Sequence, residues 1–334
     1  MTLHRSDLQK MLIGISAPSL VDLRLGCEVV SVNPNAASVT LQSGEAISAD
    51  LVIGADGVHS VVGTVLGNRQ KLLPTGDCTY RYLIPAEDML QDADLRPLIE
   101  TPAIQCWMGP GQHVVGYGIK GRSLYNMVVY VYEPDFQPEF EVSTAKGCTD
   151  QMREAYEGKG WDVRVLKLLR LAKGQHVVQH KMFHREPLDR WVHPDGPVAL
   201  LGDACHLFPP HYGQAASLAI EDAAVLGNLF SRLRHRSQIR PLLGAYESIA
   251  KPRAAATWLD SMERQTMLHL PDGPEQQARD AQIPHARGLD HRMAHEATIP
   301  MVSPHPFGYD ADKAVDLWLM RNGTSLDLLN HLEF

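Results

Sequence analysis

The sequence predicts an α/β protein that carries a second, separate sheet in the middle of the chain. Two short apolar runs, 51–53 and 198–201, each end at a glycine-aspartate turn, as buried parallel strands do where ligand-binding loops begin. Between about 75 and 195, short alternating runs of β-branched and aromatic residues are broken by Gly and Pro, which predicts a mixed or antiparallel sheet. The last third is mainly helical, from Gln214 to about Leu233 and from about Leu242 to Leu270.

Composition excludes several functional classes. The chain has 334 residues, of which 44% are hydrophobic and 21% charged, and its net charge is −8. Nucleic acid is bound mainly through Lys and Arg on phosphates, so an acidic chain without a basic arm argues against that partner. No apolar run reaches the roughly 18 residues of a membrane span. The five cysteines are odd in number and scattered, without a CxxC pair or metal-ligand spacing, which favours a reducing cytoplasmic location.

The stretch "GDACHLFPPHYGQAASLAIEDA" carries the first functional signal. Asp203 follows the predicted strand 198–201, at the end of a parallel strand where ligands bind in open α/β sheets. The helix that begins near Gly213 presents unpaired backbone N–H groups and the positive end of its dipole. An anionic or electron-accepting ligand is stabilised at such a site. The alternative is a plain strand-turn-helix in which Asp203 only caps the helix.

Four motifs in this chain resemble those of the FAD-dependent aromatic hydroxylases, the salicylate and p-hydroxybenzoate hydroxylase group, in its fungal form. The first is Gly202-Asp203-x-x-His206 followed by Pro210, Gln214 and "AIEDA". The others are "GADGVHS" at 54–60, "HRSDLQKML" at 4–12 and "LHLPDGPEQQARD" at 268–280. They occur in the family's order and span nearly the whole chain.

The resemblance implies a flavoprotein-hydroxylase-like fold: an incomplete Rossmann-type FAD layer, a mixed β-sheet substrate domain and C-terminal helices. We expect residues 1–70 to form the first part of the FAD-binding domain and 71–195 the substrate domain. Residues 196–270 would form the second part of the FAD-binding domain, and 271–334 a C-terminal segment.

The resemblance also assigns cofactor-binding residues. Asp203 would bind the ribityl chain of FAD, and the backbone amides of the next helix would face the flavin ring, where reduced flavin carries negative charge. Arg5 would contact the cofactor near its ribityl and phosphate part. The full set of expected cofactor-binding residues is Arg5, Asp56, Gly57, Asp203, Gln214, Ala215 and Ala216.

Two residues of the middle sheet match family positions over the flavin. Arg81 would stabilise a phenolate with its fixed charge, and Tyr117 would orient or protonate the substrate oxygen. The alternatives are a surface ion pair for Arg81 and a half-buried core aromatic for Tyr117. The family's activity is hydroxylation of a small aromatic or phenolic substrate with NAD(P)H and O₂, and fungal members often act in secondary metabolism.

This chain departs from the family at its start, because no strand-GxGxxG-helix unit precedes the first motif. Three explanations stay open: a start site placed at an internal Met, a flavin-free isomerase, cyclase or binding protein that kept the substrate pocket, or an inactive copy. Gly63, Ala215 and Ala250 also replace residues usual in the family. The string "GYGIKG" at 116–121 fits GxGxxG, but a strand-like run follows it, so we interpret it as a hairpin turn.

Metal and hydrolase sites find little support. "HRMAH" at 291–295 has two His residues four apart but lacks the Glu of HExxH, and we interpret it as a solvated segment. No GxSxG elbow is present for a serine hydrolase. His206 and His211 lie beside Pro209 and Pro210, where packing or hydrogen bonding is the more common role of a histidine. We therefore predict no metal.

Overall fold

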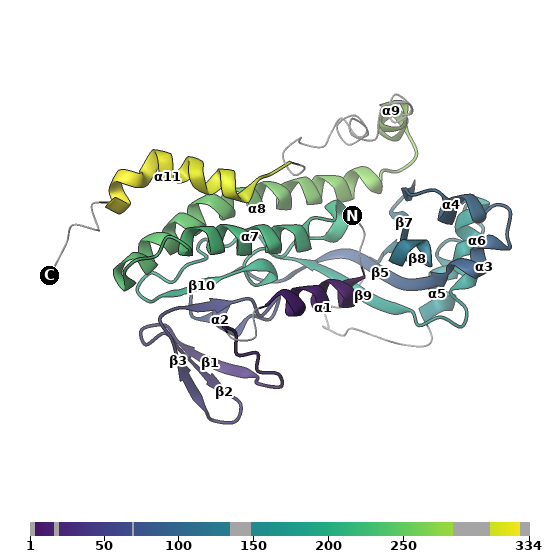
Figure 1. Cartoon of the computed structure of the whole chain (residues 1–334). Helices are drawn as coiled ribbons and strands as arrows, with labels where there is room; N and C mark the ends of the chain where they lie inside the picture. Colours follow the sequence, from purple (N-terminus) through teal and green to yellow (C-terminus); the bar gives the residue numbers. More distant parts are fainter. Residues whose placement is uncertain (1–3, 17–19, 69, 134–147, 283–307, 328–334) are drawn as a thin grey trace. The chain divides into compact units, whose positions relative to one another are not determined.

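The computed structural model describes residues 4–16, 20–68, 70–133, 148–282 and 308–327 (Figure 1). The chain divides into two compact units, each assembled from separate segments. The large-sheet unit comprises Met1–Leu23, Pro74–Met182 and Thr266–Asp280. The parallel-sheet unit comprises Arg24–Leu73, Phe183–Gln265 and Ala281–Phe334.

A five-stranded sheet forms the centre of the large-sheet unit. Its strand order is β6-β7-β8-β5-β9, and the pairs β6–β7, β7–β8 and β5–β8 are antiparallel. The predicted sheet in the middle of the chain is thereby confirmed. The strands are β5 (Leu73–Pro85), β6 (Ile104–Gly109), β7 (Gln112–Ile119), β8 (Leu124–Tyr132) and β9 (Val178–His184).

Helices cover one face of this sheet. Alternate residues of β5, among them Tyr80 and Tyr82, are buried in one core with Leu168 of helix α6 (Val163–Leu171). Because successive strand residues point to opposite faces, Thr79 and Arg81 lie on the face away from these helices. The covering helices are α3 (Ala86–Leu90), α4 (Arg96–Glu100), α5 (Cys148–Glu154) and α6 (Val163–Leu171).

The "GYGIKG" string is a hairpin turn, as predicted. Strand β7 ends at Ile119, a short 3-10 turn follows (η1, Lys120–Arg122), and β8 begins at Leu124. Two of its glycines have structural roles. A Cβ on Gly116 would collide with the ring of Tyr125. Gly121 has φ of +64°, in the left-handed region that favours glycine, and so allows the chain to turn. No helix N-terminus follows that could receive a phosphate.

Two buried parallel strands lie at the centre of the other unit. Strand β10 (Val198–Leu200) pairs with β4 (Val52–Gly54). All three β10 residues have fully buried side chains, which explains the apolar run in the sequence. On its other side β10 contacts the chain at Val192 through an antiparallel bridge to Ala199. A small antiparallel sheet, in the order β1-β2-β3, is formed by β1 (Val29–Asn33), β2 (Ser38–Leu41) and β3 (Ala46–Ser48).

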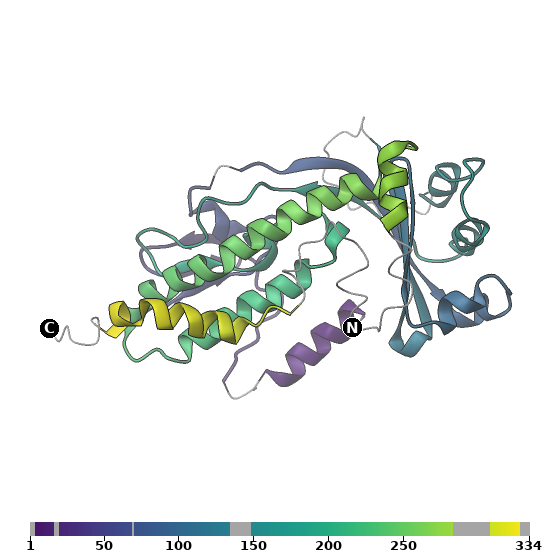
Figure 2. The ribbon, with the colours of Figure 1, turned by 90° about the horizontal axis from the view of Figure 1, so that it is seen from above.

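The helices of this unit confirm the two long helices predicted from the sequence. Helix α7 (Ala215–Phe230) and helix α8 (Ile239–Leu268) pack on β10 through a shared apolar core that includes Val225, Leu243 and Tyr246. Helix α11 (Ala311–Asp327) lies along α7, as Figures 1 and 2 both show. The remaining short elements are α2 (Val61–Thr64) and the 3-10 turns η2 (Gly202–Ala204), η3 (Pro210–Tyr212) and η4 (Arg236–Gln238).

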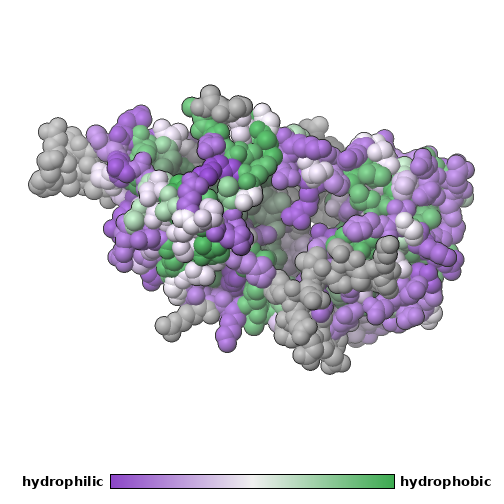
Figure 3. All heavy atoms as spheres, turned by 90° about the horizontal axis from the view of Figure 1, so that it is seen from below, coloured by the Kyte–Doolittle hydropathy of each residue, from purple (hydrophilic) through white to green (hydrophobic). Residues whose placement is uncertain are grey.

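None of the residues of helix α1 (Arg5–Ile15) is buried. Its second half exposes Met11, Leu12, Ile13 and Ile15. Figure 3 shows one face of the molecule, on which hydrophobic residues, in green, lie among hydrophilic ones, in purple. Helix α9 (Pro274–Gln282) follows α8.

No helix in the described ranges is long and apolar enough to cross a membrane. The "HRMAH" segment at 291–295 lies outside the described residues.

We predict that Gly116→Ala destabilises the protein, because the added methyl group collides with Tyr125 in a closely packed sheet. The expected loss is about 1–3 kcal/mol of unfolding free energy, measured by urea denaturation. Gly227→Ala is the matched control, since nothing lies within 4 Å of its Cβ position on α7. That change should gain about 0.5–1 kcal/mol. Equal stabilities of the two variants would contradict the packing role of Gly116.

Candidate cofactor and substrate sites

The loop after β10 places Asp203 at the surface. Gly202 has φ of +65°, which turns the chain sharply at the end of the strand. The side chain of Asp203 is exposed, and helix α7, whose N-cap is Gln214, has no side-chain capping bond. The described residues therefore do not use this carboxylate as a helix cap, and both its oxygens remain available to hydroxyl groups of a ligand.

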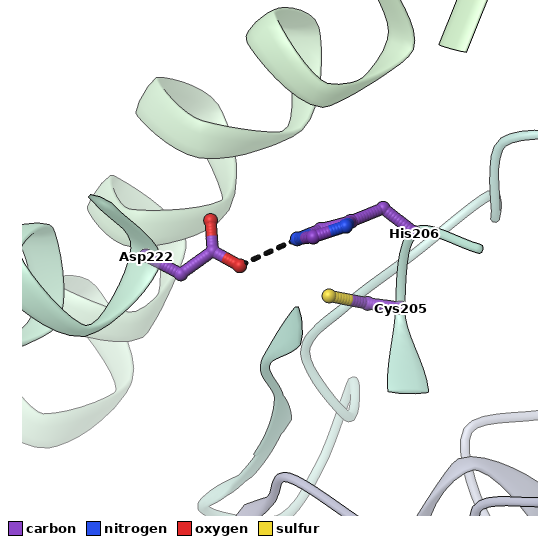
Figure 4. Close-up of side chains that lie close together, drawn as sticks. All are labelled: Cys205, His206 and Asp222. Carbon is purple, nitrogen blue, oxygen red and sulfur yellow. Dashed lines mark hydrogen bonds and ion pairs between the residues drawn. The ribbon is translucent and has the colours of Figure 1, made fainter. Parts of the chain in front are cut away.

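The buried carboxylate of Asp222 on α7 holds this loop through hydrogen bonds. Its Oδ2 accepts a hydrogen bond from the backbone N–H of Gly202 at 3.1 Å, and it lies 2.7 Å from Nε2 of His206 (Figure 4). Asp222 and His206 are only 2% and 6% exposed. The sequence analysis missed this pair, although an aspartate in the apolar stripe of a helix was its visible signal. Asp222 thus joins Gly202 and His206 of the loop to helix α7.

Cys205 lies beside this pair. Its thiol donates to the carbonyl of Gly202 at 3.2 Å, and burial raises the pKa of the thiol well above its usual range. The metal-ligating atoms of Cys205, His206 and Asp222 all lie within 4.8 Å of one another. All three nevertheless make internal hydrogen bonds, and a protonated thiol is a poor ligand. We therefore interpret the cluster as a structural bridge.

The first turn of α7 is uncapped. Gly213 has φ of +68°, and Gln214 makes no side-chain bond to the helix. The first intrahelical bond runs from the N–H of Leu218 to the carbonyl of Gln214, so the N–H groups of Ala215 and Ala216 have no acceptor in the helix. Ala216 is exposed, so the positive end of the helix dipole faces outward. This is the arrangement that stabilises a negatively charged ligand.

Asp56 follows β4, and its carboxylate accepts hydrogen bonds from within the protein. One of its carboxylate oxygens accepts the N–H groups of Val61 and Val62 at 2.8 and 3.1 Å, and the other accepts the hydroxyl of Ser60. Asp56 thereby caps the short helix α2. Gly57 has φ of +77°, which lets the chain turn between the strand and this helix. A direct role of Asp56 and Gly57 toward a cofactor stays a prediction.

Arg81 and Tyr117 lie on the same face of the large sheet, the face without helices. Arg81 pairs with Val128, which pairs with Val115 of β7, and Tyr117 lies two residues further along β7 on the same side. Both residues also affect the pKa of Tyr130, which lies on the same face. Burial raises that pKa to about 12, the charge of Arg81 lowers it, and Tyr117 raises it further. The sheet therefore brings the two predicted substrate residues to one surface.

Arg81 is charged and has an unused donor. Its Nε is buried without a hydrogen-bond partner, and it forms no ion pair with any described residue. Nearby His180 on β9 has its pKa lowered by burial and by the charges of Arg81 and Arg5. Three basic side chains thus gather in this unit, and Arg81 is not the surface ion pair that the sequence left open. Tyr117 is half-buried.

Arg5, the first residue of α1, is exposed and belongs to the large-sheet unit. Its contact with the cofactor stays a prediction.

Residues 2–260 match the family model of an FAD-binding domain. The chain belongs to the FAD-dependent aromatic hydroxylase family. The chain is 31% identical over 319 residues to the FAD-dependent monooxygenase OpS4 of Beauveria bassiana, covering 94% of this chain and 73% of that protein. It is 35% identical to the FAD-dependent monooxygenase atnJ of an Arthrinium species, covering 84% of this chain and 66% of that protein.

Among solved structures, a salicylate hydroxylase substrate complex superposes with a TM-score of 0.71 at 27% identity. The match covers 94% of this chain and 75% of the other. The chain spans about two thirds to three quarters of the length of these three proteins. The flavoprotein-hydroxylase fold expected from the sequence is confirmed.

The described residues of the chain fit FAD. An exposed carboxylate suits the hydroxyl groups of the ribityl chain, and an uncapped helix N-terminus suits the electron-rich side of the flavin. Ala215 adds a methyl group where the family usually has glycine, but its backbone N–H still has no acceptor in the helix.

We predict that Asp222→Ala destabilises the protein by roughly 2–4 kcal/mol, because it leaves the Gly202 N–H and the His206 ring buried without their acceptor. Urea denaturation monitored by circular dichroism measures the change. The control is Asp316→Ala, which removes an exposed partner of Arg232 on α11 and should cost less than about 1 kcal/mol. Similar losses in the two variants would show that the buried bridge has no special role.

Proposed function

We propose that this protein is an FAD-dependent monooxygenase that hydroxylates a small aromatic or phenolic substrate with NAD(P)H and O₂. The observation that carries the proposal is the exposed carboxylate of Asp203 beside the uncapped N-terminus of α7, at the carboxyl end of β10. Ligands of open α/β sheets bind at this edge. The family match over residues 2–260 supports the choice of FAD as the ligand.

The roles of the cofactor-binding residues follow from their chemistry. Asp203 accepts hydrogen bonds from ribityl hydroxyls, and the N–H groups of Ala215 and Ala216 donate to the flavin ring. The positive end of α7 stabilises negative charge on that ring. When bound, FAD supplies electron transfer from NAD(P)H and activation of O₂, and the protein supplies orientation and electrostatics.

Arg81 and Tyr117 are the proposed substrate residues. A guanidinium with a buried, unsatisfied N–H stabilises a phenolate or carboxylate on an aromatic ring. Tyr117 orients the substrate oxygen or gives it a proton. Two relatives support a substrate of this kind by name: the 3-amino-4-hydroxybenzoate 2-monooxygenase PtnB3 of Streptomyces platensis and the salicylate hydroxylase.

We also propose that the protein works in a reducing, cytoplasmic environment. The five cysteines are scattered along the sequence without a CxxC pair, which supports this location.

We predict that the purified protein binds FAD and that Asp203→Ala weakens this binding at least tenfold, about 1.4 kcal/mol, through loss of the ribityl contact. Titration of apoprotein with FAD, followed by flavin fluorescence, measures the affinity. Asp195→Ala is the control, since its side chain is also exposed in the same unit. A wild-type protein that stays colourless and gains no flavin band at saturating FAD would contradict the proposed function.

We predict that Arg81→Ala leaves FAD bound but lowers kcat/KM for a phenolic or benzoic substrate by roughly 10²–10³, because the substrate anion loses its charged partner. A panel of hydroxybenzoates, screened by substrate-dependent NAD(P)H oxidation, identifies a substrate for the assay. Arg81→Lys should recover part of the activity. Arg170→Ala, an exposed arginine on α6, should leave it unchanged. Full activity in Arg81→Ala would remove this residue from the site.

A further inference from the structure

A small cavity lies beside the loop that carries Asp203, within the parallel-sheet unit. The volume open to a water-sized sphere is about 10 Å³, enough for one water molecule or one monatomic ion. The loop contributes Cys205 and His206 to the lining, and helix α8 contributes four residues between Lys251 and Trp258. The lining residues are Arg185, Pro187, Trp191, Cys205, His206, Lys251, Ala254, Ala255 and Trp258.

Three nitrogen atoms of the lining residues are buried without a hydrogen-bond partner. They are Nε of Arg185, Nε1 of Trp258 and Nδ1 of His206. His206 is 6% exposed, so its ring cannot reach bulk water instead. Buried polar groups in folded proteins nearly always have a partner, so these nitrogens suit a small polar or charged occupant of the cavity.

The charge of the lining is positive. Arg185 donates from Nη2 to the carbonyl of Val58 at 2.9 Å, and the ammonium of Lys251 donates to the carbonyl of Asp189. Neither cation pairs with a carboxylate among the described residues, and no Asp or Glu lines the cavity. Burial lowers the pKa of Arg185, and no acidic side chain opposes that shift.

We propose that this cavity binds a single monatomic anion, a halide such as chloride. The positive lining disfavours a metal cation, and the small volume suits a monatomic ion. A halide accepts from several N–H donors at once and also neutralises the two cations, which a water molecule does not.

The site differs from the proposed cofactor site, so its test does not depend on FAD. The occupant would hold His206 of the loop to Arg185 and to Trp258 of α8. This adds a second attachment to the one made by Asp222.

Chloride NMR linewidths and thermal denaturation test the proposal. The wild-type protein should broaden the chloride signal, and its denaturation midpoint should be higher in potassium chloride than in potassium gluconate of equal ionic strength. Trp258→Phe removes one N–H donor while keeping the ring, and should weaken chloride binding about tenfold. Trp318→Phe on α11, away from the cavity, should behave like the wild type and corrects for general salt effects.

A crystal grown in bromide should show an anomalous peak between Arg185 and Trp258. Density for an ordered water only, with no anomalous peak, would overturn the proposal. So would a chloride effect of equal size in wild type and Trp258→Phe.

Discussion

Asp222 accepts a backbone N–H from Gly202 and faces His206, and this buried carboxylate organises the proposed cofactor site. Gly202 begins the turn η2 after β10, and His206 lies at the end of the same short loop. Gly202 and His206 are both bonded to Asp222 of α7, and Asp203 between them is exposed. The same bond fixes the helix whose uncapped first turn faces outward. One charge inside the protein thus positions the two groups that we expect to bind FAD.

Local pattern was enough to predict these groups. An apolar strand followed by Gly-Asp, and a helix that starts at Gly213 and Gln214, are short-range features that one stretch of sequence contains in full. Asp222 was missed as a partner because the contact joins residues sixteen or more positions apart. Hydrophobic periodicity places a residue on a helix face, but it does not identify what that face meets.

The large sheet illustrates a different limit. Alternation predicted its strands, and the glycines of "GYGIKG" were correctly assigned to a hairpin because a strand follows them. Strand order and register depend on contacts between distant segments, so only the structure shows that Arg81 and Tyr117 share a face. Their function, like that of Arg5, Asp56 and Gly57, remains a prediction from family resemblance. The buried nitrogens around the small cavity could not be predicted from the sequence, because they belong to residues that are distant along the chain.

The chain passes from one compact unit to the other after Leu23, Leu73, Met182, Gln265 and Asp280. Strands β5 and β9 and helix α8 each begin in one unit and end in the other. Asp203 belongs to one unit and Arg81 to the other. No single cut of the polypeptide separates the two units, because their segments alternate along the chain.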